Sequence, residues 1–130
     1  AIGIQQLAKL DGIRRTRMNT CMFYNKLLSQ IDGVTTPKSD FKDICPFLYY
    51  IRVSPKSRDD LRAHLLKDGI DTGIHWQPGH LFELFKNCRS GSLQVTEKVG
   101  KEILSLPLHS YMSEQTSERV VSSVKEFFGK

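Results

Sequence analysis

The stretch SRDDLRAHLLKDGIDTGIHWQP, residues 57–78, places a helical pattern directly before an extended one. Ser57 and Asp60 resemble a capping box, with Asp in place of the usual Glu, and two leucines follow one turn apart. Gly69 suits the left-handed position that closes a helix. His64 lies inside the helical pattern, and we expect it to be a surface residue. The stretch therefore predicts a helix that is followed at once by an element of a different kind.

The extended half of this stretch alternates apolar and polar side chains over residues 70–78, which predicts a strand that Pro78 ends. Trp76 shares its parity with the isoleucines of this strand, so it is predicted to point inward or toward an interface. His75 is predicted to point outward, and His80 follows on the next loop. Connections at strand ends often carry binding residues, so these side chains are candidates for a site. The alternative is that both histidines are solvated loop residues.

The rest of the chain alternates helical and extended patterns, with no repeat and no internal boundary. The other predicted elements are a long amphipathic helix over residues 4–31 with a bend at Gly12, a central strand over 46–53 covered on both faces, a helix carrying Val95, Val99 and Ile103 that Pro107 ends, a short extended segment at 103–110, and a final helix capped by Ser113. This order predicts an α+β fold, a small sheet covered by helices, in one domain over residues 1–130.

The composition is that of an ordinary globular domain. Of the 130 residues, 39% are hydrophobic and 25% are charged. No segment reaches the roughly 18 uninterrupted apolar residues that a membrane span requires. Three cysteines without a Cys-x-x-Cys pair suit a reducing compartment. We therefore expect a soluble cytoplasmic protein with no membrane partner.

The net charge of +5 raises the question of a nucleic-acid partner. The basic residues are spread thinly, however, and the densest cluster consists of Arg14, Arg15 and Arg17. No aromatic residues are interleaved there, so a solvated helix face is the better interpretation. No nucleic-acid partner is expected.

Three residues, His75, His80 and Cys88, are of the kinds that bind zinc. Their spacing shows neither a helical i, i+4 pair nor clustered cysteines, so no metal site is expected. A Cys-His nucleophile pair has no better support, because buried cysteines are usually inert. No glycine spacing matches a phosphate-binding loop. From composition and spacing alone, the prediction stops at an α+β domain.

The opening residues AIGIQQLAKLDG show no initiator Met, no N-cap and no basic segment before an apolar run. They do not match a signal peptide. We therefore expect further protein upstream of Ala1.

Three stretches in collinear order resemble one protein family: AIGIQQLAKLDGIRRTR at the start, RDDLRAHLLKDGIDTGIHWQPGHL in the middle and EILSLPLHSYMSEQTSERVVSSVKEFF at the end. Together they are similar to the C-terminal domain of the DegT/StrS family of nucleotide-sugar aminotransferases. The resemblance covers nearly the whole chain. It implies the small domain of a fold-type-I aminotransferase, with a mainly antiparallel sheet, as part of a longer enzyme of polysaccharide biosynthesis.

Members of this family use pyridoxal phosphate (PLP) to move an amino group, commonly from glutamate, to a keto-sugar linked to a nucleotide diphosphate. The resemblance implies that an N-terminal large domain supplies the Schiff-base lysine, the acidic partner of the pyridine nitrogen and the phosphate site. None of these matches this chain, so no catalytic or cofactor-binding residue is expected in it. The chain alone is expected to be inactive. Its implied partners are the large domain, the nucleotide-sugar and a second subunit of a homodimer.

The resemblance also implies that the turn containing His75, Trp76 and His80 lies near the nucleotide-sugar entrance, which makes these three the predicted substrate-binding residues. Relatives commonly have His-Tyr where this chain has His75-Trp76, and Leu-Pro where it has Leu93-Gln94. The tryptophan enlarges the apolar surface and removes a hydroxyl, so the sugar is not specified. Two other functions stay open: a non-catalytic regulator of the same fold, and a self-standing binding module.

Overall fold

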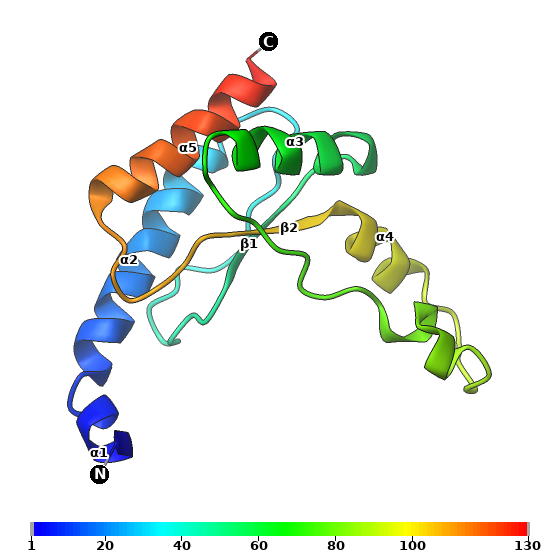
Figure 1. Ribbon diagram of the computed structural model, residues 1–130, viewed down its shortest axis with the longest axis horizontal. Coiled ribbons are helices and arrows are strands. Elements are labelled where there is room, and N and C mark those ends of the chain that lie inside the picture. The colour runs from blue at the N-terminus through cyan, green and yellow to red at the C-terminus, as the bar shows by residue number, and fades with distance from the viewer. Residues whose placement is uncertain (1, 130) are drawn as a thin grey trace.

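Two short strands form the centre of the structure (Figure 1). In this computed structural model, which describes residues 2–129, β1 (Tyr49–Arg52) and β2 (Ile103–Leu106) pair antiparallel, with Ile51 opposite Leu104. Both of these side chains are fully buried, so the pairing brings apolar residues of the two strands to one face. The small antiparallel sheet confirms the predicted α+β class.

Single bridges extend this sheet at both edges. Thr35 bonds to Arg52 on one side, and Gly73 bonds to Ser105 on the other. The strand predicted over residues 70–78 is therefore wrong, because one bridge takes its place. The chain turns away from the sheet soon after the bridge, so no ladder forms.

Helices pack around the sheet and extend beyond it. They are α1 (Ile2–Leu7), α2 (Leu10–Leu28), α3 (Pro55–Lys67), α4 (Gln94–Glu102) and α5 (Glu114–Phe128), with the 3-10 turns η1 (Gly79–Leu81) and η2 (Glu83–Phe85). α2 packs against α5, and α3 contacts both α5 and α4 (Figure 1). α4 and the two 3-10 turns form an arm that reaches away from α2 and α5. No helix in the described part of the chain is long and apolar enough to cross a membrane.

The core lies where α2, α3 and α5 meet the sheet. Side chains from these helices and from both strands are fully buried there, including Leu28, Ile51, Leu61, Leu104 and Val124. Complete burial of one such side chain stabilises the fold by about 1.5–3 kcal/mol. The valines of α5 belong to this core, so the last helix packs one apolar face inward.

Two buried tyrosines join α2 to the sheet. The ring centroids of Tyr24 and Tyr49 lie 5.0 Å apart. Tyr49 donates a hydrogen bond from Oη to Asn25 Oδ1 at 2.7 Å, and Tyr24 donates from Oη to the Pro107 carbonyl at 3.1 Å. Burial raises the pKa of both phenols, so the two hydroxyls remain protonated donors.

α3 begins earlier than the sequence predicts. Ser54, not Ser57, is the N-cap, and its Oγ accepts a hydrogen bond from the Lys56 backbone N–H at 3.3 Å. Pro55 occupies the first helical turn, where its missing N–H costs nothing. The capping box predicted at Ser57 and Asp60 is therefore wrong, because Pro55 already fixes a helical φ before Ser57 is reached.

The end of α3 follows the prediction. Gly69 has a φ of +72°, which a residue with a side chain adopts only with strain. The Gly69 N–H bonds to the Leu66 carbonyl at 2.9 Å and the Ile70 N–H to the Leu65 carbonyl at 2.8 Å, which are the two bonds of a Schellman motif. Leu65 and Ile70 are both buried, so the motif also fixes where the chain leaves the helix.

The long helix predicted over residues 4–31 is interrupted at residues 8–9, and helical geometry runs unbroken through Gly12. The Lys9 N–H bonds to the Gln6 carbonyl, three residues back, which tightens the chain at the interruption. No side chain of α1 is buried. Tertiary packing therefore does not hold the first helix in line with the second.

The last two helices give one wrong prediction and one that is confirmed. α4 stops at Glu102, because Ile103 begins β2. The predicted helix was to carry Ile103 and to end at Pro107, so its predicted end is wrong. Val95 is 77% exposed and no residue of α4 is buried. Ser113 caps α5 as predicted, and its Oγ accepts a hydrogen bond from the Thr116 N–H at 3.0 Å.

We expect alanine to have opposite effects at two glycines. Gly12→Ala should raise the free energy of unfolding by about 0.5–1 kcal/mol, because Gly12 lies in a helix interior where an added Cβ meets nothing within 4 Å. Gly69→Ala should lower it by about 1 kcal/mol, because φ at this position is +72°. Urea unfolding of the two variants measures both effects. Equal responses at the two positions would contradict the backbone geometry described above.

Candidate functional site

Residues 73–76 carry the chain from the sheet edge into an exposed turn. The imidazole of His75 and the indole of Trp76 lie edge to face, with ring centroids 5.4 Å apart. His75 is exposed, as predicted. Trp76 is 65% exposed, so its predicted inward orientation is wrong. The prediction relied on the alternation of side chains along a strand, and no strand runs through this position. Its place at an interface stays a prediction.

Phe47 forms an aromatic pair with Trp76 that the sequence did not predict. The two ring centroids lie 6.2 Å apart, and the ring planes differ by 27°. The predicted strand over residues 46–53 would have covered Phe47, but β1 begins only at Tyr49, and Phe47 is 67% exposed. The two rings come from distant segments, so no local pattern reveals their contact. An exposed aromatic pair is a surface on which ring-shaped ligands stack.

A cavity of about 380 Å³ opens beside these rings. Its walls combine aromatic, charged and hydroxyl-bearing side chains and include Phe47, Asp71, Gly73, His75, Ser105 and Pro107. Apolar walls with a few convergent polar groups are typical of small-molecule sites. The structure thus places His75 where it can contact a bound molecule.

His80 lies on η1 and contacts α4 rather than the cavity beside His75. Its Nε2 is 3.1 Å from Glu97 Oε1, and 23% of its side chain is exposed. The carboxylate accepts the Nε2 hydrogen, which ties η1 to α4 and leaves Nδ1 as the ring atom available to a ligand. The three predicted residues therefore fall into two groups, His75 with Trp76 and His80 with Glu97.

Burial governs the reactivity of Cys21 in α2. The residue is fully buried, and desolvation raises the pKa of its thiol to about 12, although the nearby Arg17 favours the thiolate. A thiol with this pKa stays protonated at neutral pH and is a poor nucleophile. The other two cysteines, Cys45 and Cys88, are exposed.

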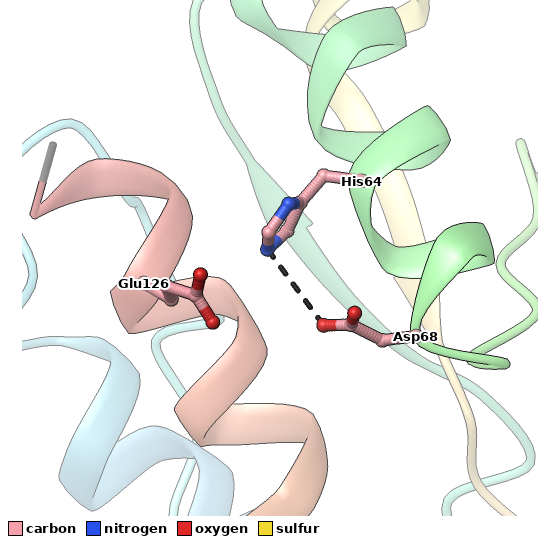
Figure 2. Close-up of side chains that lie close together, drawn as sticks. All are labelled: His64, Asp68 and Glu126. Atoms are coloured by element: carbon pink, nitrogen blue, oxygen red, sulfur yellow. Dashed lines mark ion pairs between the residues drawn. The ribbon is translucent and has the colours of Figure 1, made fainter.

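Away from this site, three side chains converge between α3 and α5. Figure 2 shows His64 on α3, Asp68 at the end of this helix and Glu126 on the facing helix. Their potential ligand atoms lie within 4.8 Å of one another, and the three residues considered as zinc ligands in the sequence are not part of this group. The prediction that His64 is a surface residue is wrong, because its side chain is 16% exposed and packs against Phe127.

Hydrogen bonds already engage this group. His64 Nε2 lies 3.1 Å from the Ser123 carbonyl oxygen, which can only accept, so Nε2 carries a hydrogen and offers no lone pair to a metal. Ser123 donates from Oγ to Asp68 Oδ2 at 2.5 Å, and Arg119 donates to the Asp68 carbonyl. The contacts join the end of α3 to α5, which explains the group as a structural network.

The described lysines do not fit a PLP site. Every lysine over residues 9–125 is exposed. A lysine that forms a Schiff base lies instead in a desolvated pocket, because desolvation lowers its pKa and makes it a nucleophile. That a Schiff-base lysine lies outside this chain stays a prediction.

Residues 1–125 match the family model of the DegT/DnrJ/EryC1/StrS aminotransferase family, so the chain belongs to this family. The match confirms the resemblance found in the three sequence stretches. It covers the sheet, the exposed turn and the beginning and middle of α5.

Two curated relatives and one solved structure illustrate the match. A pleiotropic regulatory protein of Geobacillus stearothermophilus is 34% identical over 124 residues, which are 92% of this chain and 33% of that protein. The dTDP-4-amino-4,6-dideoxy-D-glucose transaminase of Shigella dysenteriae is 30% identical, over 97% of this chain and 36% of that protein. The crystal structure of S. venezuelae DesV in complex with a ketimine intermediate has a TM-score of 0.86 at 30% identity, over 95% of this chain and 34% of DesV. The chain thus spans about a third of the length of these relatives.

We expect His64 to stabilise the contact between α3 and α5 without binding a metal. His64→Ala should lower the free energy of unfolding by about 1–3 kcal/mol, because it removes the hydrogen bond to the Ser123 carbonyl and the packing of the imidazole on Phe127. Thermal unfolding with zinc and with EDTA should show the same loss. His109→Ala is the control, because His109 is exposed and bonds only locally, to the Tyr111 N–H. One equivalent of zinc that survives dialysis of the wild type, and is lost in His64→Ala, would identify a metal site instead.

Proposed function

We propose that this chain is the C-terminal small domain of a PLP-dependent aminotransferase that transfers an amino group from glutamate to a nucleotide-linked keto-sugar. The observation that carries the proposal is the match of nearly the whole chain to about a third of each transaminase relative. The name of the Shigella relative specifies an amino sugar linked to dTDP. On this proposal an N-terminal large domain holds PLP, and two copies of the full-length protein form a homodimer.

Exposed apolar side chains support contact between this chain and another domain. They lie on α1, on the turn after the sheet edge, on η2 and on α4, and include Ile2, Leu7, Trp76, Leu84 and Val95. Large apolar side chains that are exposed in this way often mark a contact with another protein surface. We assign this surface to the N-terminal large domain of the same protein.

His75 and His80 are proposed to bind polar groups of the nucleotide-sugar. His75 lines the cavity beside the Phe47–Trp76 pair, where an imidazole can donate a hydrogen bond to a polar group of the ligand. Trp76 offers ring surface to the same ligand. His80 is bonded to Glu97, so it contributes either from Nδ1 or by holding η1 in place.

A non-catalytic regulator with this fold is the second candidate function. One observation favours it: the Geobacillus relative, at 34% identity, carries the name of a pleiotropic regulatory protein. The two functions differ in the cofactor lysine of the full-length protein. A lysine in a PLP-binding context upstream of this chain supports the aminotransferase, and its replacement supports the regulator.

The 130-residue chain by itself should be catalytically silent. The reason is that its described lysines are exposed and do not form a PLP pocket. Mixing the chain with PLP, glutamate and a nucleotide-linked keto-sugar should give no amino-sugar product above the level of PLP alone, as measured by mass spectrometry. Turnover by the isolated chain would overturn the domain assignment.

In the full-length protein, His75→Ala or His80→Ala should weaken use of the sugar substrate by about 1–3 kcal/mol in kcat/KM, because a polar group of the ligand loses its partner. The half-reaction with glutamate should be largely spared, since it involves no nucleotide-sugar. Single-turnover kinetics of each half-reaction separate the two effects, and His109→Ala is the control. Equal loss in both half-reactions, or loss in neither, would reject the proposed roles.

A further inference from the structure

Ser105, in the middle of β2, carries a buried hydroxyl without a partner. The residue is 4% exposed, and its Oγ makes no hydrogen bond within the described part of the chain. Roughly nine in ten or more of buried polar groups are paired in native proteins, because an unpaired one is destabilising. A hydroxyl retained at this cost points to a partner that binds from outside the chain.

The backbone places the His75 ring beside this hydroxyl. Gly73 and Ser105 exchange two backbone hydrogen bonds, at 3.1 and 2.7 Å, so their side-chain directions share one face of the sheet. Gly73 has no side chain, and the imidazole of His75 occupies the space that a Cβ would need. The imidazole therefore lies over the face in which the Ser105 hydroxyl is buried.

This face belongs to the cavity of about 380 Å³. Ser105 and His75 line it together with Asp71 and Phe47. A sugar ring presents the matching groups, because its hydroxyls bond to hydroxyl, imidazole and carboxylate side chains and its C–H faces pack on aromatic rings. The negative charge of Asp71 disfavours a phosphate at the same place.

We propose that the cavity is a subsite for a sugar ring, in which Ser105 and Asp71 bind sugar hydroxyls and Phe47 packs against the ring. The inference rests on the proposed function, because it makes the sugar of the nucleotide-sugar the occupant. Solvent does not reach Ser105 Oγ, so a bound sugar turns the ring of His75 aside. His75 is exposed and has room to move. Ser105 then acts on recognition of the sugar and not of the nucleotide.

Titration of dTDP-glucose into the 130-residue chain, followed by heteronuclear NMR, tests this subsite. We expect the backbone amide signals of Gly73, His75 and Ser105 to shift. Ser105→Ala should weaken the binding of dTDP-glucose about 5- to 20-fold and leave the response to dTDP unchanged, since only the contact with the sugar is lost. Equal affinity of wild type and Ser105→Ala for dTDP-glucose, or no shift of these amides in the wild type, overturns the proposal.

Ser117→Ala is the matched control. Ser117 is 2% exposed, but its Oγ donates to the Ser113 carbonyl at 2.9 Å, and it does not line this cavity. Ser117→Ala should lower the melting temperature and leave binding of dTDP-glucose unchanged. Ser105→Ala should not lower the melting temperature, because no hydrogen bond is lost. A less stable Ser105→Ala variant with unaltered binding would show that the hydroxyl serves the fold alone.

Failure of the subsite and failure of the proposed function give different results. If the full-length protein transfers no amino group while the chain still binds the glucose unit through Ser105, the function is wrong and the subsite stands. If the full-length protein transfers amino groups and Ser105→Ala has the KM of the wild type for the nucleotide-sugar, the subsite is wrong and the function stands.

Discussion

The fold depends on the buried contact of Tyr49 in β1 with Tyr24 and Asn25 in α2. β1 has four residues and pairs with one full strand, so the sheet is too small to be stable without a helix against it. The two rings supply the apolar contact, and the bond from Tyr49 Oη to Asn25 Oδ1 fixes its geometry. Asn25 in turn donates to the carbonyls of Pro37 and Ser39, which ties the connection between α2 and β1 to the same point. One helix thereby positions both the sheet and the chain that leads into it.

The position of the cavity follows from the register that this contact fixes. Along β2, Leu104 and Leu106 pair with buried residues of β1, and Ser105 between them points to the opposite face. A shift by one residue would turn Ser105 into the core and a leucine toward Gly73. The polar wall of the cavity is therefore a consequence of core packing, although it contributes nothing to the core itself.

Local chemistry made part of the fold predictable from the sequence. Gly69 and Ser113 were assigned correctly, because a helix end needs a left-handed residue or a side-chain acceptor whatever surrounds it. The strand predicted over residues 70–78 failed because alternation shows that a segment can be extended but not that a neighbour pairs with it. The inward orientation predicted for Trp76 failed with the strand on which it rested. The exposure of Val95 depends on the arm formed by α4, which no periodicity reveals.

The candidate site could be predicted from the sequence only in part, because its geometry depends on contacts that a local pattern does not reveal. Family resemblance led to the turn with His75 and His80, but only the structure separates the two: His80 bonds to the distant Glu97, whereas the ring of His75 lies against Gly73, two residues back. One bridge, at Gly73, ties this segment to the sheet, so its side chains are free to change without disturbing the packing of α2 against β1. Relatives with names as different as a transaminase and a regulatory protein match the chain around it. On the proposed function, a fixed strand register beside a turn held by one bridge allows the residues that bind the ligand to differ among relatives while the core stays the same.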